Sequence, residues 1–334
     1  MAWTSQKIAV IGGGSWATAL VKILAENASL RIHWWLRDNR DVEHINKHHH
    51  NPSYLSDVYI NPKRVTTYTS LEAAIKGTDY VLLVIPAAFV KDPFLEADRG
   101  LLKNKIVISA VKGLLPNEHI PVTDWVIREF GVPESNVAVI GGPCHAEEVA
   151  QGRQSYLTIA SPDLKTAGKV AEILTCRYVG ATPSTDLYGV EYAAVMKNII
   201  ALACGITHGM GYGDNFQAVL VSKSMTEIGD FLQAVDPRSR DLTASAYLGD
   251  LLVTAYSQFS RNRLFGKMIG RGYSVAAAQL EMNMIAEGYY AAKSIHLLNE
   301  KLGVRMPISD MVYKIIYEQV SPVAAVEELK GMLN

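Results

Sequence analysis

The glycine-rich turn at residues 12–14 constrains the fold of this chain more than any other feature. An apolar, mostly β-branched run over residues 8–11 leads into three glycines, and a helix-compatible segment follows at once. In such a unit Gly12 makes the tight turn, and Gly14 lets the backbone approach a pyrophosphate that a Cβ would exclude. Ala17 supplies the small side chain needed for packing, and the helix N-terminus favours a diphosphate. The turn therefore predicts dinucleotide binding, although a glycine-rich turn with a purely structural role has the same sequence pattern.

Apolar strand patterns and helical segments alternate through the first half of the chain. Strands are predicted over residues 30–36, 80–85, 106–110, 137–140, 156–160 and 178–181, with a helix over 164–175. Beyond residue 185 the strand patterns stop, and helical segments broken by glycine and proline follow. The sequence therefore predicts an α/β protein with two domains. A Rossmann-like, doubly wound, mostly parallel sheet occupies residues 1–186, and an all-α domain occupies residues 187–334.

Composition narrows the function classes. The length of 334 residues and the hydrophobic fraction of 49% suffice for two cores. A net charge of -1 argues against a nucleic-acid binder. Cys144, Cys176 and Cys204 are scattered and odd in number, which favours a reduced, cytoplasmic compartment. The first strand begins too early for a signal peptide, and no apolar run reaches the roughly 18 residues of a membrane span, so neither is expected.

Arg37 and Asp38 follow the predicted second strand, where such folds meet the adenosine ribose. An acidic side chain there bonds a 2′-hydroxyl, whereas arginine accepts a 2′-phosphate. Since both residues are present, NAD and NADP both stay open.

The run His48–His50 invites comparison with a metal site. Three consecutive residues cannot converge on one ion from a helix, and no carboxylates accompany them. A solvated segment is expected there, and no metal.

Lys197 and Asn198 lie in the middle of a segment, residues 190–203, that is apolar nearly all round and is therefore expected to be buried. A buried ammonium needs a partner or a wet cleft, and it suits proton transfer near neutral pH. The alternative is a structural ion pair, for example with Glu191. A catalytic role is the favoured reading, because perturbed groups gather at functional sites.

Polar residues also follow predicted strands in the first half. Lys112 comes just past the strand at 106–110, where ligands bind in open α/β sheets, or it is a surface lysine in a loop. Gly142 frees the backbone after the strand at 137–140. Cys144 has no assignable base and is expected to be a small buried thiol. His145 is a candidate catalytic residue, but a helix-start histidine that makes a local bond is the commoner outcome.

Further polar groups lie in the second half. Asp250 is an acid inside an apolar segment. The run Ser260–Arg263 packs hydroxyl, guanidinium and amide donors into four residues, which suits a phosphate but also a solvated basic turn. Glu287 stands beside a glycine near a helix start, where capping is the simpler explanation.

Together these motifs resemble those of the bacterial-type NAD(P)-dependent glycerol-3-phosphate dehydrogenase family over essentially the whole chain. The resemblance rests on five ordered segments, residues 12–20, 111–114, 142–148, 195–198 and 260–266. It implies NAD or NADP as cofactor, a Rossmann domain followed by a helical domain, and a homodimer. Cys144 stands where the family has Ser or Thr, and His145 where it has an aromatic residue.

The resemblance also implies roles for single residues. Lys197 matches the proton-transferring residue, with Asn198 and Asp250 orienting lysine and substrate. The implied cofactor contacts are Gly12, Gly14, Ser15, Trp16, Arg37, Lys112, Ala146, Arg261, Ile285 and Glu287. The implied substrate contacts are Lys112, Gly142, Cys144, Lys197, Asp250, Ser260, Arg261 and Asn262.

The expected activity is the reversible reduction of dihydroxyacetone phosphate, a small phosphorylated substrate, to sn-glycerol 3-phosphate for phospholipid synthesis. One rival is a β-hydroxyacid dehydrogenase, in which the lysine and asparagine tend to lie a helical turn apart rather than adjacent as here. The other is a redox sensor that binds the dinucleotide without turnover. Such a sensor does not require a lysine inside an apolar helix.

Overall fold

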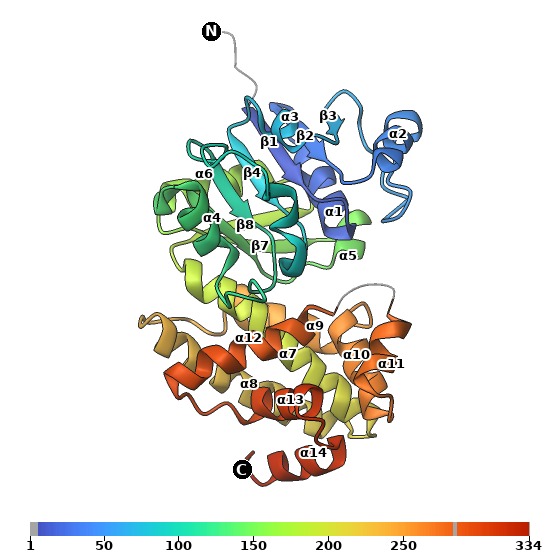
Figure 1. Ribbon diagram of the computed structural model, residues 1–334, viewed down its shortest axis with the longest axis vertical. Helices are drawn as coiled ribbons and strands as arrows, with labels where there is room; N and C mark the ends of the chain where they lie inside the picture. The colour runs from blue at the N-terminus through green and yellow to red at the C-terminus, as the bar shows by residue number, and fades with distance from the viewer. Residues whose placement is uncertain (1–5, 283–285, 334) are drawn as a thin grey trace. The chain divides into compact units, whose positions relative to one another are not determined.

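The computed structural model describes residues 6–282 and 286–333 (Figure 1). The chain divides into two compact units. The first comprises the chain up to Val111 together with Val122–Leu187. The second comprises Lys112–Pro121 together with the chain from Tyr188 onward. The short segment Lys112–Pro121 therefore leaves the sheet unit and returns to it.

An eight-stranded sheet forms the centre of the first unit in the described residues. Its strands are β1 Gln6–Ile11, β2 Leu30–Trp35, β3 Val65–Tyr68, β4 Tyr80–Leu83, β5 Ile106–Ser109, β6 Val137–Gly141, β7 Ser155–Ala160 and β8 Val179–Ser184. The spatial order is β3-β2-β1-β4-β5-β6-β7-β8. Neighbouring strands are parallel except for β6 and β7, which run antiparallel. This confirms the doubly wound, mostly parallel sheet.

The strand order reverses beside β1. Ile8 pairs with Ile32 of β2 on one side and with Tyr80 of β4 on the other. In open parallel sheets the crevice at such a switch point, beyond the carboxyl ends of the strands, is where ligands bind. The glycine turn follows β1 directly, so the chain places it at this crevice.

The helices of the first unit are α1 Ser15–Ala25, α2 Asn39–His48, α3 Leu71–Ile75, α4 Val122–Phe130, α5 Ala146–Ala150 and α6 Leu164–Leu174. Side chains of Asp38, Ser70 and Asp163 cap α2, α3 and α6 by accepting bonds from backbone N–H groups. The sequence pattern did not identify β3, because this strand has only four residues, is only partly buried and contains no apolar run.

The second unit is all helical in its described part, which confirms that prediction. Its helices are α7 Leu187–Gly209, α8 Asp214–Val235, α9 Asp250–Tyr256, α10 Arg261–Gly270, α11 Val275–Glu281, α12 Glu287–Leu302, α13 Pro307–Tyr317 and α14 Pro322–Lys330. Among the described residues α7 alone is long and apolar enough to cross a membrane, yet its apolar window is wholly buried. It is the core helix of this unit (Figure 1).

Helices α7 and α10 cross in close backbone contact. The crossing uses two pairs of glycines spaced four residues apart, Gly205 with Gly209 on α7 and Gly266 with Gly270 on α10. A Cβ on Gly266 would press against the carbonyl oxygen of Leu202, well inside van der Waals contact. The crossing holds the start of α10 at a set position against the middle of α7.

Candidate active site

The glycine turn has the geometry that a dinucleotide requires. Gly12 adopts φ +137°, and a Cβ there would lie 2.8 Å from the carbonyl carbon of Val84. At Gly14 a Cβ would meet nothing within 4 Å, so the backbone is open on that side. Gly14 caps α1, whose first turn carries no acidic residue. The first N–H groups of a helix lack intrahelical acceptors and attract anions, so Gly12, Gly14, Ser15 and the start of α1 fit a diphosphate.

Two side chains that the sequence patterns missed hold this turn. Trp34 Nε1 donates to the Gly12 carbonyl at 2.7 Å, and Asn51 Nδ2 donates to the Gly13 carbonyl at 3.0 Å. Asn51 is only 1% exposed. The available signal was a polar residue before proline, which reads as an ordinary loop.

Arg37 and Asp38 follow β2 and differ in their hydrogen bonds and exposure. The Asp38 carboxylate caps α2 through the Arg40 backbone N–H at 2.9 Å and pairs with the Arg40 guanidinium at 2.6 Å. Hydrogen bonds from Arg40 lower the pKa of Asp38 to about 2. Arg37 is exposed. The carboxylate that would meet a ribose hydroxyl is thus already hydrogen-bonded.

Three predicted contacts, Gly142, Cys144 and Ala146, lie in the segment that follows β6. Gly142 has φ +105°, and a Cβ there would lie 2.7 Å from the Tyr156 carbonyl oxygen. Cys144 is buried, as expected, and its thiol donates to the Gly142 carbonyl at 3.2 Å. His145 and Ala146 begin the short helix α5.

Lys197 and Asp250 form a buried ion pair in the helical unit. Nζ of Lys197 on α7 contacts Oδ1 of Asp250, and the two side chains are 5% and 2% exposed. Oδ2 of Asp250 is buried, with no hydrogen-bond partner among the described residues. A turn of π-helix, Ser245–Gly249, directly precedes Asp250, and such turns are frequent at functional sites. The pair presents an ammonium and a free carboxylate oxygen within one small region.

A chain of amide hydrogen bonds links four segments of the same unit. Asn262 Nδ2 donates to Asn198 Oδ1 at 2.8 Å, and Asn198 Nδ2 donates to the Lys112 carbonyl at 2.9 Å. The Gly288 backbone N–H donates to Asn262 Oδ1 at 2.9 Å. These bonds tie α7, the start of α10, the start of α12 and the segment Lys112–Pro121 to one another.

Of the predicted residues of the second half, Asn198 and Asn262 are members of this amide chain. Lys197 and Arg261 adjoin its two asparagines, and Glu287 adjoins Gly288. Arg261 is exposed at the first position of α10, and Ser260 caps that helix by accepting from the Arg263 N–H at 3.3 Å. The predicted cofactor contact Ile285 lies outside the described residues. Lys112 also belongs to the helical unit, whereas Gly12, Gly14, Ser15, Trp16, Arg37, Gly142, Cys144 and Ala146 belong to the sheet unit.

The histidines near the end of α2 gather in an unexpected way. His44 and His50 approach with their Nε2 atoms 3.4 Å apart, and the rings of His44 and His48 are 4.5 Å apart. His49 turns to Tyr59 instead. Even so, within the described residues no group of three or more His, Cys, Asp or Glu side chains is arranged to hold a metal ion.

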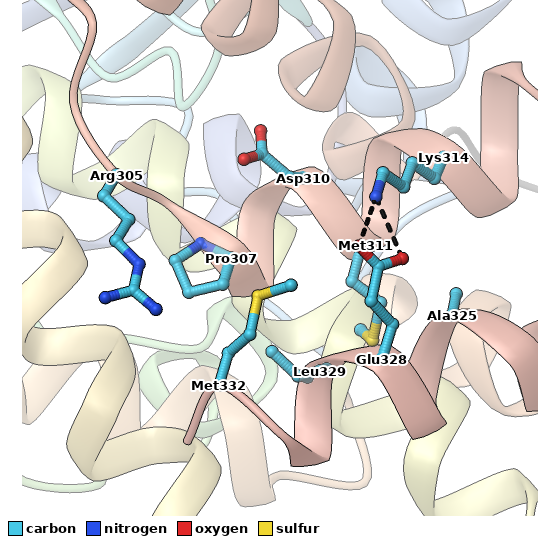
Figure 2. A pocket seen from close by; sticks show the side chains of 9 residues that line it. All are labelled: Arg305, Pro307, Asp310, Met311, Lys314, Ala325, Glu328, Leu329 and Met332. Carbon is cyan, nitrogen blue, oxygen red and sulfur yellow. Dashed lines mark hydrogen bonds and ion pairs between the residues drawn. The ribbon is translucent and has the colours of Figure 1, made fainter. Parts of the chain in front are cut away.

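A small cavity of about 100 Å³ between α13 and α14 contains none of the predicted site residues (Figure 2). Figure 2 shows Lys314 reaching Glu328 across it, with Nζ and Oε1 2.8 Å apart. The predicted chemistry therefore does not involve this cavity.

Family comparison identifies relatives along almost the whole chain. Residues 7–167 match the family model described as NAD-dependent glycerol-3-phosphate dehydrogenase N-terminus. Residues 186–327 match the model described as the C-terminus of the same family.

Individual relatives agree with this match. A glycerol-3-phosphate dehydrogenase [NAD(P)+] of Shouchella clausii is 34% identical over 331 residues, covering 98% of this chain and 97% of the relative. One from Clostridium botulinum is 35% identical over 323 residues, covering 97% and 96%. The crystal structure of glycerol-3-phosphate dehydrogenase from Coxiella burnetii superposes with a TM-score of 0.88 at 30% identity, covering 98% of this chain and 99% of that one.

Proposed function

The chain belongs to the NAD-dependent glycerol-3-phosphate dehydrogenase family, and from that membership we infer that it interconverts dihydroxyacetone phosphate and sn-glycerol 3-phosphate with NAD(H) or NADP(H). The observation that carries the chemistry is the buried pair of Lys197 and Asp250. Reduction of a ketone needs a hydride at carbon and a proton at oxygen. The bound reduced cofactor supplies the hydride, and the protein must supply the proton.

Lys197 is the proton donor in this proposal. Its ammonium lies in a buried position and is neutralised by Oδ1 of Asp250. The proton moves from Lys197 Nζ to the carbonyl oxygen of the substrate, and the reverse reaction returns it. The unpartnered Oδ2 of Asp250 then accepts a hydrogen bond from a substrate hydroxyl. Asn198 orients the neighbouring lysine through its bonds to Asn262 and Lys112.

Arg261 holds the substrate phosphate in this proposal, with Lys112 and the α10 N-terminus as further positive groups. Asn262 secures the start of α10, which carries Arg261, against α7, which carries Lys197. Ser260 and Asn262 are buried beside it. Binding energy at the phosphate then positions the carbonyl, an effect worth on the order of 7 kcal/mol in favourable cases.

The sheet unit binds the dinucleotide in this proposal. The glycine turn and the start of α1 take the diphosphate, with Ser15 and Trp16 in the first turn. Ala146, at the start of α5, is a further proposed cofactor contact of this unit. We propose NADP(H) as the preferred cofactor, because Arg40 occupies the Asp38 carboxylate while Arg37 is exposed.

The biological setting belongs to the same proposal. We infer a homodimer in the cytoplasm that supplies glycerol 3-phosphate to phospholipid synthesis, and no nucleic-acid partner. Size-exclusion chromatography with light scattering measures the oligomeric state directly.

The deciding experiment follows NADH and NADPH oxidation separately with dihydroxyacetone phosphate, and with dihydroxyacetone as control. Turnover only with the phosphorylated ketone supports both the activity and the phosphate role of Arg261. Reduction of NAD+ or NADP+ by small hydroxyacids without phosphate would instead favour the β-hydroxyacid dehydrogenase. Cofactor binding with no turnover on any of these would favour the redox sensor.

A further inference from the structure

Three successive carbonyl groups of the glycine turn are held by buried side chains. Trp34 Nε1 donates to the Gly12 carbonyl at 2.7 Å, and Asn51 Nδ2 donates to the Gly13 carbonyl at 3.0 Å. Thr18 Oγ1 donates to the Gly14 carbonyl at 3.1 Å. The backbone of the turn is thus gripped from the protein side at each of these three peptide groups.

Asn51 links two of these three bonds. The same Nδ2 group also donates to Thr18 Oγ1 at 2.9 Å, which orients the hydroxyl toward Gly14. Its Oδ1 accepts from the N–H groups of Ser53 at 3.0 Å and Tyr54 at 3.1 Å. A primary amide has two donor hydrogens and two acceptor lone pairs, so Asn51 is fully used. Asn51 is 1% exposed and Thr18 is fully buried, so water does not compete for these bonds.

The direction of these carbonyls determines the direction of the adjacent N–H groups. The peptide bonds of the turn are trans, since no described peptide bond is cis. In a trans peptide the C=O of one residue and the N–H of the next point in opposite directions. Holding the carbonyls of Gly13 and Gly14 inward therefore turns the N–H groups of Gly14 and Ser15 outward, the direction that an anion at the start of α1 needs.

We propose that Asn51 is a positioning residue for the dinucleotide: with Thr18 it aims the Gly14 and Ser15 N–H groups at the diphosphate. The inference rests on the proposed function for the presence of a dinucleotide. A loop anchor alone would need only the acceptor side of Asn51, which holds Ser53 and Tyr54. The donor side serves the turn, so the two roles separate chemically.

Asn51→Asp separates the loop-anchoring role from the role in the glycine turn, because aspartate keeps the acceptor oxygen and loses the Nδ2 donor. Thr18→Val is a second, isosteric variant that removes the hydroxyl at Gly14. Asn61→Asp is the matched control, because Asn61 Oδ1 accepts from the Lys63 N–H at 3.0 Å in a similar loop turn. The readout is the dissociation constant of NADPH and NADH without substrate, measured by nucleotide fluorescence, followed by kcat and KM.

We expect both Asn51→Asp and Thr18→Val to weaken dinucleotide binding about tenfold or more. At saturating cofactor kcat stays within about twofold, and Asn61→Asp changes neither quantity. If Asn51→Asp does not fold, Thr18→Val decides the question. Unchanged dinucleotide affinity in a folded variant overturns this inference while wild-type turnover stands. Wild-type protein that binds NADPH but does not reduce dihydroxyacetone phosphate overturns the proposed activity and leaves this inference in place.

Discussion

The side-chain amide of Asn262 donates to that of Asn198 at 2.8 Å, joining the first turn of α10 to the middle of α7. Each asparagine has a functional candidate as its neighbour, Arg261 in one case and Lys197 in the other. One buried hydrogen bond therefore fixes the helix start that carries the proposed phosphate-binding group against the helix that carries the proposed proton donor.

Removing that bond should cost both stability and substrate affinity. Asn262→Leu leaves Asn198 Oδ1 and the Gly288 N–H without their partners, and each buried unsatisfied group costs roughly 1–3 kcal/mol. Urea unfolding measures the stability loss, and the KM for dihydroxyacetone phosphate should rise. Asn215→Leu, at an exposed position of α8, is the control and should change little. Equal KM values for wild type and Asn262→Leu would contradict the positioning role.

Lys197→Met should abolish most turnover and spare cofactor binding. Loss of a positioned general acid lowers rates by roughly 10²–10⁴-fold. Because the change leaves the Asp250 carboxylate buried and unpaired, the double variant Lys197→Met/Asp250→Asn tests whether lost activity reflects lost folding. Lys223→Met on the exposed face of α8 is the control. Steady-state kinetics with fluorescence-measured NADPH affinity separates the two effects, and normal turnover in Lys197→Met would refute the assignment.

Gly266→Ala should destabilise the helical unit although alanine favours helices. The new methyl group would collide with the Leu202 carbonyl of α7 and force the helices apart. The matched change Gly168→Ala in α6 meets no atom within 4 Å and should stabilise by roughly 0.5–1 kcal/mol. Opposite shifts in the urea midpoints of the two variants are expected. A stabilised Gly266→Ala would contradict the close crossing.

Glu227 should make stability decrease as pH rises. Burial raises its pKa from the ordinary 4.5 to about 7, against the lowering effect of hydrogen bonds from Ile308 and Ser309. The folded state then holds a proton that the unfolded state releases. The stabilisation is complete below about pH 4.5 and is lost as pH rises through about 7, with a full range of roughly 3 kcal/mol.

Urea unfolding of wild type and Glu227→Gln at pH 5.5 and pH 8 measures this contribution. Glutamine does not titrate, so the difference in unfolding free energy between the two proteins should change between these pH values. The wild type should lose stability relative to the variant at the higher pH. A difference that is constant with pH would show that Glu227 keeps an ordinary pKa.

Arg37→Ala should lower kcat/KM for NADPH by about tenfold or more and leave that for NADH nearly unchanged, because only NADPH carries the 2′-phosphate. Arg31→Ala, at an exposed position on β2, is the control. An equal loss of kcat/KM with both cofactors would instead show that Arg37 does not act on the 2′-phosphate.

Much of the fold follows from local patterns. Apolar runs and glycine placement in the sequence indicate the strand ending at Ile11, the buried strands β4 to β6 and the change to helices near residue 187. Those signals are local because each strand or helix buries its own face. The partly exposed strand β3 carries little of that signal and was missed.

The sequence by itself determined the elements and the residue types that proton transfer and phosphate binding need, since Lys197 is out of place in an apolar helix by composition alone. Only the tertiary structure decided the partners. Asp250 lies 53 residues after Lys197 in the chain (250 − 197), and the Asn198–Asn262 hydrogen bond joins residues 64 positions apart. The hydrogen bond from Asn51 to the Gly13 carbonyl joins residues 38 positions apart. Such pairings depend on how helices and strands pack, and no local pattern of residues encodes that packing.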